Sequence, residues 1–399
     1  MNILFIIHNL GPQRPDSRSK VIEGGCEQFT YNMAHTLSME NTCYLLYPDV
    51  KDGAKLHLHR IKNFRNEHLE EWDATSNLKK LDLFSDLLKE KEIDVVHFQH
   101  VIYTPLEFVL IAKSMNIPTV LSIHDYYYIC EEHFLENDKY VTCKLPTNLE
   151  ECATCLHNKE SIPKSTVYKR RELMKVFLSK IDLITAPSKS IRSDYFKIFP
   201  ELNDKMKVIE IGIPETYPTA DKKDIPQDGN VYIAVRSYFT MLKGSIYIKN
   251  TIKALERWYP EIKFVIQTTM LDKDNYLYLS KLSNVILDEE RKITPHLVWI
   301  PSVAKESYSL IASETMRQGL PILCRNKGAL GERVAPEYNY LYKEHAHLDD
   351  IITCIINIAK DRETLSSNID KAQENTDLAR TVEFTANQFQ HLYKKMLTK

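Results

Sequence analysis

The chain has 399 residues, of which 43% are hydrophobic and 27% charged, a balance typical of a folded protein with room for two domains. This composition excludes a largely disordered chain, and the formal net charge of −2 excludes a chain-wide attraction to nucleic acid. No apolar run reaches the roughly 20 residues that cross a bilayer, and the opening residues lack a signal-peptide cleavage pattern. We therefore predict a cytoplasmic protein without a nucleic-acid partner.

Strands and helices alternate in the first half of the chain. MNILFII reads as a buried strand, and a polar loop through Gly24 and Gly25 leads into a helix with an apolar face. Further strands are predicted at TCYLLY, DVVHF, PTVLSI and DLITAP, with helices near residues 78–91 and from Pro105. This alternation predicts a parallel sheet covered by helices, a Rossmann-like domain over residues 1–212 with a cysteine-rich insertion at about 126–160.

The second half repeats this pattern after a break. Residues 213–230 are rich in proline and charge and are predicted to be a linker. Strands at VYIAV, KFVIQ, NVILD, HLVWI and PILC then alternate with helices over residues 231–380, and a last helix in 381–399 is expected to pack back toward the first domain. The predicted fold class is α/β, with two Rossmann-like domains facing across a cleft that holds the ligand beyond the strand ends.

Glu306 and Glu314 mark the most informative stretch of the chain, at the entry to a predicted helix. A helical path between them would span about 12 Å, too far for a glycosidase pair, whose carboxyl groups lie about 5 to 9.5 Å apart. The spacing suits the binding of an extended ligand, with one acid on a sugar and the other on a ribose. The helix N-terminus between the two acids would then face a diphosphate. An ordinary amphipathic helix with solvated glutamates explains the same residues.

Cations and glycines mark two further strand-to-helix turns. Arg236 ends one strand, and Lys243 and Gly244 precede the next helix, a pattern that favours a diphosphate site but also fits a solvated loop. The Gly24-Gly25 pair permits a close ligand approach or a plain helix entry. Because it lacks the G-x-G-x-x-G spacing, a nicotinamide enzyme is disfavoured.

Histidines lie at several predicted strand ends. His124, followed by Asp125, is placed to bind a sugar hydroxyl or move a proton, with a structural histidine as the equal alternative. For His8, His97 and His100 a structural role is favoured.

Four cysteines, Cys130, Cys143, Cys152 and Cys155, share the polar insertion. They suit a structural zinc site or unliganded thiols. Asp272-Lys273-Asp274 reads as a helix start in preference to a metal motif. The basic stretch 161–180, with Met174 and Phe177 among its apolar residues, fits a solvated helix better than a peripheral membrane contact, which stays open.

Together these motifs resemble the GT-B glycosyltransferases, and most closely the retaining family 4. The segment from Glu306 to Pro321 is similar to that family's E-x7-E motif followed by Gly-x-Pro. Where relatives often have Glu-Gly-Phe-Gly, this chain has Glu306-Ser307-Tyr308-Ser309, which leaves the donor sugar undefined.

The resemblance assigns roles to individual residues. It implies that Arg236 and Lys243 hold the donor diphosphate, that Glu306 contacts the donor sugar, and that Glu314 binds the ribose. His124 would lie beside the reacting centre. The donor-binding set is completed by Gly24, Gly25, Ser309 and Leu310. Some relatives carry cysteines after their His-Asp, which favours zinc.

The resulting prediction is a retaining glycosyltransferase without a catalytic cofactor. It would move a sugar from a UDP- or GDP-sugar to a glycan or lipid-linked acceptor, in cell-surface polysaccharide biosynthesis. Two alternatives are a non-hydrolysing nucleotide-sugar epimerase and a catalytically silent binding subunit of the same fold. The residues identify neither the acceptor nor the oligomeric state.

Overall fold

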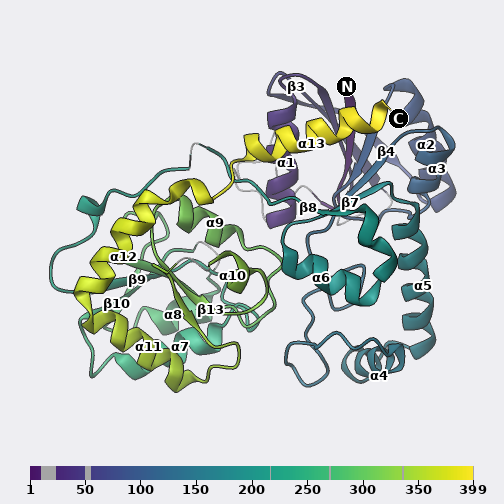
Figure 1. The fold of residues 1–399 in the computed structure, drawn as a ribbon. Coiled ribbons are helices and arrows are strands. Elements are labelled where there is room, and N and C mark those ends of the chain that lie inside the picture. The colour runs from purple at the N-terminus through teal and green to yellow at the C-terminus, as the bar shows by residue number, and fades with distance from the viewer. Residues whose placement is uncertain (10–23, 50–54, 216, 269–270, 335–336, 399) are drawn as a thin grey trace. The chain divides into compact units, whose positions relative to one another are not determined.

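The computed structural model describes residues 1–9, 24–49, 55–215, 217–268, 271–334 and 337–398. The chain divides into two compact units (Figure 1): unit 1 is Met1–Glu215 with Arg380–Lys399, and unit 2 is Thr216–Ala379. Each unit has its own sheet and its own core of buried apolar side chains. The predicted α/β class with two mainly parallel sheets is confirmed.

Unit 1 contains an eight-stranded sheet. From edge to edge the strands are β4 (Arg65–Asp73), β3 (Lys55–Lys62), β2 (Thr42–Pro48), β1 (Asn2–Ile6), β5 (Val95–Phe98), β6 (Thr119–Ser122), β7 (Leu183–Ala186) and β8 (Met206–Val208). Strands β1, β2 and β5–β8 pair in parallel, as their continuous apolar runs predict for strands covered on both faces. The chain order reverses between β1 and β5, so the switch point of this sheet lies there.

The sheet of unit 1 also has an antiparallel edge that the sequence patterns do not predict. Strands β3 and β4 pair antiparallel across a turn at Asn63 and Phe64, whose φ angles are 49° and 63°. Positive φ at both central residues is typical of the two-residue hairpin turn that matches strand twist. Strand β4 carries polar, mostly exposed side chains, so it lacks the apolar alternation by which a strand is recognised.

The helices of unit 1 follow the expected apolar spacing. In α1 (Gly25–Leu37), Phe29, Met33 and Leu37 are buried, one turn apart on a single face. The others are α2 (Asn77–Glu90), α3 (Phe108–Ser114), α4 (Leu149–Glu160), α5 (Lys164–Lys180), α6 (Lys189–Ile198) and α13 (Val382–Leu397), with a short 3-10 helix at Pro200–Lys205.

The last helix, α13, packs across α1 on unit 1 (Figure 1). Its Phe389 and Tyr393 are buried, and the hydroxyl of Tyr393 lies 2.6 Å from Nδ1 of His97. The other ring nitrogen of His97 lies 2.8 Å from the hydroxyl of Ser122. His97 therefore has the structural role that the sequence favours.

Unit 2 contains a six-stranded parallel sheet. From edge to edge the strands are β11 (Val285–Leu287), β10 (Ile262–Ile266), β9 (Val231–Val235), β12 (Leu297–Ile300), β13 (Ile322–Arg325) and β14 (Tyr340–Tyr342). The helices are α7 (Ser245–Leu255), α8 (Lys273–Leu279), α9 (Leu310–Arg317), α10 (Gly328–Arg333), α11 (Leu348–Lys360) and α12 (Arg362–Glu374), with 3-10 turns at Lys222–Asp224 and Thr376–Leu378. The switch point lies between β9 and β12, the two central strands.

The predicted linker 213–230 differs from the structure. Ile213 pairs with Thr381 inside unit 1, and the boundary between the units falls after Glu215. Beyond it, the amide of Ala220 donates to the carbonyl of Gln318, and Ile225 is buried in the core of unit 2. Proline and charge made this segment resemble a free connection, although its few apolar residues attach it to unit 2.

Candidate functional site

Arg236 lies at the carboxyl end of β9, at the switch point of unit 2. Its side chain is buried, its Nε donates to Oε1 of Gln267 over 3.0 Å, and its Nη1 donates to Oε1 of Gln318. Gln267 in turn donates to Asp288 over 2.9 Å. Burial, aided by the charge of Arg291, lowers the pKa of Arg236 to about 10, so the guanidinium stays charged at neutral pH. The result is a fixed buried cation at the sheet edge where ligands of such folds bind.

Gly244 forms the turn between this strand and α7. It has φ of 84°, and a Cβ atom built on it would lie 2.4 Å from the carbonyl oxygen of Pro301, the residue that follows β12. Only glycine fits both demands. The turn thus brings the amino end of α7, the positive end of the helix dipole, against the switch point, a position suited to an anion.

Lys243 and Glu306 form an ion pair beside this turn, with Nζ 2.6 Å from Oε1. Burial by itself would raise the pKa of Glu306, but the ammonium of Lys243 and the hydroxyl of Ser302 outweigh it and lower the pKa. The structure therefore brings together two predicted site residues and holds Glu306 as a carboxylate.

The turn from Glu306 into α9 is held by unusual backbone geometry. Ser309 has φ of 78°, and its hydroxyl caps α9 by accepting from the amide of Ala312. Arg333 donates to the carbonyls of Tyr308 and Ser309 over 2.8 and 3.0 Å. Ser309 thus adopts a conformation that glycine adopts at lower cost. The helix begins at Leu310, so Glu306 lies in the loop before it, and only Glu314 lies on the helix.

Glu314 takes part in a compact polar triangle. Its Oε2 accepts from the hydroxyl of Tyr217 over 2.9 Å and from Nη1 of Arg291 over 3.2 Å. The same Nη1 donates to the Tyr217 hydroxyl over 2.6 Å. Glu314 lies one turn before Gln318, the partner of Arg236, so the triangle belongs to the same site.

Unit 1 gathers polar side chains at its own switch point. His124 lies 2.8 Å from the side-chain oxygen of Gln99, through Nε2. Burial is the main cause that lowers the pKa of His124 to about 3, so its imidazole is neutral at physiological pH. A neutral imidazole can bind a hydroxyl, but it is a poor reservoir of protons.

Two histidine–carboxylate pairs lie at the same edge. Nε2 of His100 lies 3.4 Å from Oδ2 of Asp125, and Nε2 of His8 lies 3.1 Å from Oε1 of Glu27. The rings of His8 and His100 are 4.6 Å apart. His8 and His100, expected to be structural, therefore belong to the polar edge that contains His124.

The predicted glycine pair lies at the start of α1. Gly24 precedes α1 with φ of 99°, and an added Cβ would lie 2.2 Å from a carboxylate oxygen of Glu27. Gly25 is the first residue of the helix. The loop before them, residues 10–23, lies outside the described residues.

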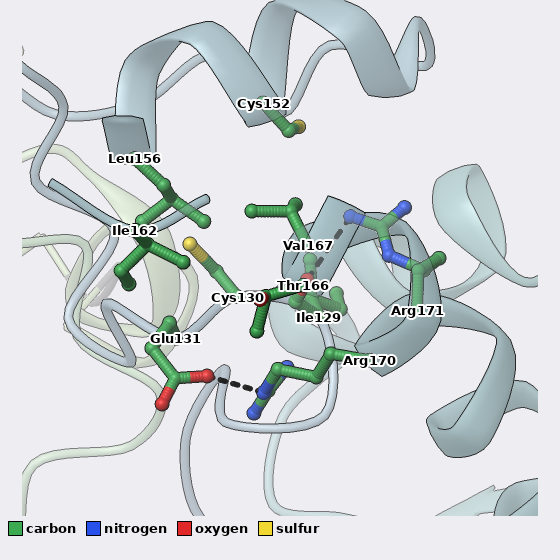
Figure 2. Close-up of a pocket in the computed structure, with 10 residues that line it drawn as sticks. All are labelled: Ile129, Cys130, Glu131, Cys152, Leu156, Ile162, Thr166, Val167, Arg170 and Arg171. Carbon is green, nitrogen blue, oxygen red and sulfur yellow. Dashed lines mark hydrogen bonds and ion pairs between the residues drawn. The ribbon is translucent and has the colours of Figure 1, made fainter. Parts of the chain in front are cut away.

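The four cysteines of the insertion are free thiols in a lobe around α4 and α5. Sγ of Cys143 accepts from the amide of Leu145 and Sγ of Cys155 from that of Asp138, each over 3.3 Å. Figure 2 shows Cys130 and Cys152 on the wall of a small cavity of about 20 Å³. Among the described residues, no group of three or more histidine, cysteine or acidic side chains is arranged to hold a metal ion. The zinc site stays a prediction.

The basic stretch 161–180 forms α5, and part of its charge is used internally. Arg170 pairs with Glu131, and Arg171 donates to the carbonyl of Ile129 over 3.0 Å. Met174, Phe177 and Leu178 are buried, so they are not available to a bilayer. Leu173 and Val176 remain exposed. No helix in the described parts of the chain is long and apolar enough to span a membrane.

Several residues of these sites escape prediction from the sequence. Gln267 and Gln318 carry a detectable signal, because one ends a strand and the other lies one turn beyond Glu314. Tyr217 and Arg291 carry none, since both lie in polar segments without periodicity. Asp272, by contrast, caps α8 by accepting from the amide of Asn275, which confirms the helix-start interpretation.

Comparison with known proteins gives one family match and several matches of fold. Residues 23–217 match the model of Glycosyltransferase Family 4. No curated protein matches the chain in sequence.

Solved structures match both units. HepE of Anabaena in complex with UDP has 15% identity and a TM-score of 0.64, over 99% of this chain and 100% of that one. Sucrose-phosphate synthase from Thermosynechococcus elongatus has 14% identity and a TM-score of 0.67, over 100% and 99%. The starch synthase IV catalytic domain from Arabidopsis thaliana, bound to ADP and acarbose, has 13% identity and a TM-score of 0.62, over 100% and 99%. The match of residues 23–217 and the shared fold thus make this chain similar to the GT-B glycosyltransferases of family 4.

Proposed function

We propose that this protein is a retaining, metal-independent glycosyltransferase that uses a UDP- or GDP-sugar and a glycan or lipid-linked acceptor, in cell-surface polysaccharide biosynthesis. One observation carries the proposal: the buried Arg236, the Lys243–Glu306 pair and the amino end of α7 converge at the switch point of unit 2. Two cations and the positive end of a helix dipole suit a diphosphate.

The donor is assigned to unit 2. Arg236 and Lys243 would bind the diphosphate, and Glu306, kept ionised by Lys243, would accept hydrogen bonds from the sugar hydroxyls. Glu314 would accept from the ribose, with the backbone at Ser309 and Leu310 between the two acids. HepE has been solved with UDP-glucose, and Staphylococcus aureus TarM with α-GlcNAc-glycerol and UDP, which supports donors of this class.

The reaction needs no covalent enzyme intermediate. The bond from the anomeric carbon to the diphosphate oxygen breaks, and an acceptor hydroxyl forms the new bond on the same face. The departing phosphate takes the hydroxyl proton. Arg236 and Lys243 would stabilise the charge that grows on the leaving group, an effect greatest in the transition state.

Unit 1 is assigned to the acceptor. His124, neutral at physiological pH, would orient a hydroxyl, with Gln99 fixing its ring. Gly24 and Gly25 would allow a close approach at the start of α1. We also assign the protein to the cytoplasm, where nucleotide-sugars are available to it.

The test is sugar transfer from a panel of UDP- and GDP-sugars to glycan acceptors, with products resolved by mass and by the anomeric coupling constant in NMR. We expect transfer with a retained anomer, unchanged by EDTA, and a fall of about 10²- to 10³-fold in kcat for Lys243→Ala. The matched control is Lys253→Ala, because Lys253 also pairs with a glutamate but on the exposed face of α7. Conversion of the donor without an acceptor would indicate an epimerase, and donor binding without any product a silent subunit.

The zinc site of the cysteine lobe is proposed separately. Burial raises the pKa of the Cys143 and Cys155 thiols, and the backbone amide that each sulfur accepts offsets part of this rise, so a bound zinc ion would have to supply the rest of the thiolate stabilisation. Purified protein should contain about one zinc per chain by mass spectrometry of the metal, and Cys152→Ser should lose it. Cys354→Ser, in unit 2, should retain it. Metal-free wild-type protein after growth with zinc would refute the site.

A further inference from the structure

The hydroxyl of Tyr217 is hydrogen-bonded to Glu314, the acid that we assign to the donor ribose. Its hydroxyl donates to Oε2 of Glu314 and accepts from Nη1 of Arg291, over 2.9 and 2.6 Å. A ribose hydroxyl has the same capacity, one donated and one accepted hydrogen bond, and would compete for the same carboxylate oxygen. The phenol therefore satisfies Glu314 in the way that a nucleotide would.

The charges around the phenol keep it a donor. Burial, together with the negative charge of Glu314, raises the pKa of Tyr217 to about 12, so the hydroxyl stays protonated at neutral pH. The positive charges of Arg291 and Arg236 act in the opposite direction and offset part of this rise in the pKa. Arg291 holds the carboxylate through its own contact of 3.2 Å.

The backbone near Tyr217 is anchored, although the side chain is not part of a helix or strand. Three residues on, Ala220 donates from its amide to the carbonyl of Gln318 over 3.0 Å and accepts from the side chain of Gln373 over 3.3 Å. A rotation of the Tyr217 side chain would free Glu314 while this segment stays attached to α9. Displacement would thus cost two hydrogen bonds and no unfolding.

We propose that Tyr217 is an internal occupant of the ribose subsite, which a nucleoside diphosphate must displace before Glu314 can bind its ribose. This inference rests on the proposed function. Arg291 acts as a positioning residue that keeps the Glu314 carboxylate in place when the phenol leaves. Affinity for the nucleotide is therefore lowered by the fraction of molecules in which Tyr217 occupies the acid.

The test is the Kd of UDP, GDP and ADP by calorimetry for wild-type protein and Tyr217→Phe, which removes the hydroxyl and keeps the ring. We expect the nucleotide that binds wild-type protein to bind Tyr217→Phe about two- to tenfold more tightly, because a ribose hydroxyl replaces the bond to Glu314 and the net loss on displacement is the single bond from Arg291. The matched control is Tyr232→Phe, whose hydroxyl donates to Asp228 over 2.6 Å at the opposite end of β9. Its Kd should not change.

A second arm of the test uses inorganic pyrophosphate, which has no ribose and would bind only to Arg236 and Lys243. Its Kd should be the same in wild-type protein and Tyr217→Phe. An unchanged or weaker nucleotide affinity in Tyr217→Phe would overturn the inference, as would an equal gain for pyrophosphate. Wild-type protein that binds no nucleoside diphosphate would instead refute the proposed donor site, and with it this inference.

Discussion

At the scale of single residues, the site of unit 2 depends on charges held in low-polarity surroundings. Lys243 and Glu306 are both largely buried, with 28% and 12% of their side chains exposed, so their interaction is less screened than that of a surface pair. Each side chain compensates for the burial of the other. Removing one of these side chains leaves the other charge buried without a partner, which destabilises the folded state.

The first prediction concerns the pH dependence of this pair. The pKa of Glu306 is lowered from its ordinary 4.5, so the pair contributes stability above that pH and loses it as the pH falls through the folded-state pKa. Lys243→Met should therefore lower the free energy of unfolding by about 2 kcal/mol at pH 7, and the difference from wild-type protein should shrink below about pH 4.5.

Urea unfolding of both proteins between pH 3.5 and pH 7.5 would measure this. Lys253→Met provides the comparison, because the Lys253–Glu256 pair is exposed on α7 and should change stability little at any pH. A deficit for Lys243→Met that stays constant down to pH 3.5 would contradict the assigned ionisation.

At the scale of elements, the turn into α7 decides where the helix points. Gly244 and Gly229 share nearly the same backbone angle, with φ of 84° and 86°, but differ in their surroundings. The Cβ of an alanine at 244 would collide with the Pro301 carbonyl, whereas the space around 229 holds no heavy atom within 4 Å.

The second prediction compares alanine at these two glycines. Gly229→Ala should lose about 1 kcal/mol of stability, the cost of a left-handed alanine. Gly244→Ala should lose at least about 2 kcal/mol more, because a backbone carbonyl must move, and it should also weaken nucleotide binding. Chemical unfolding monitored by circular dichroism measures both. Equal losses would mean that the approach to Pro301 is not tight.

At the scale of the whole molecule, the chain ends on the unit in which it began. Helix α13 completes the core of unit 1 from residues about 380 positions away from β1. Phe389 is 1% exposed on the inner face of this helix, and Phe384 is 47% exposed on the outer face. The returning helix is thus an integral part of unit 1.

The third prediction tests the contribution of α13 to the stability of unit 1 by replacing phenylalanine with alanine on its buried and on its exposed face. Phe389→Ala should cost about 3–5 kcal/mol, since a large buried ring is replaced by a cavity. Phe384→Ala on the same helix should cost less than about 1 kcal/mol. Urea unfolding followed by far-ultraviolet circular dichroism would measure the loss in free energy of unfolding for each variant. Similar costs would show that α13 is only loosely attached.

Local pattern was enough for most of the parallel strands, though not for the three-residue strands β8 and β14, and it was enough for α1 and α7 and for the strand-end positions of Arg236 and His124. Buried strands and amphipathic helices can be recognised from the periodicity of apolar residues along a short segment. A ligand site at the carboxyl edge of the sheet then follows from the parallel order of the strands. The polar hairpin β3–β4 escaped prediction because its strand β4 has no apolar face. Zinc, acceptor and donor base stay predictions, because composition and spacing do not select among ligands of similar chemistry.

The contacts of the site required the folded chain. Lys243 meets Glu306 across 63 positions, and Tyr217 meets Glu314 across 97, with no periodicity linking either pair. The two histidine–carboxylate pairs of unit 1 likewise join separate strands and a helix. Such contacts arise where the strand order reverses, and that reversal depends on how whole elements pack, so it cannot be read from any one segment.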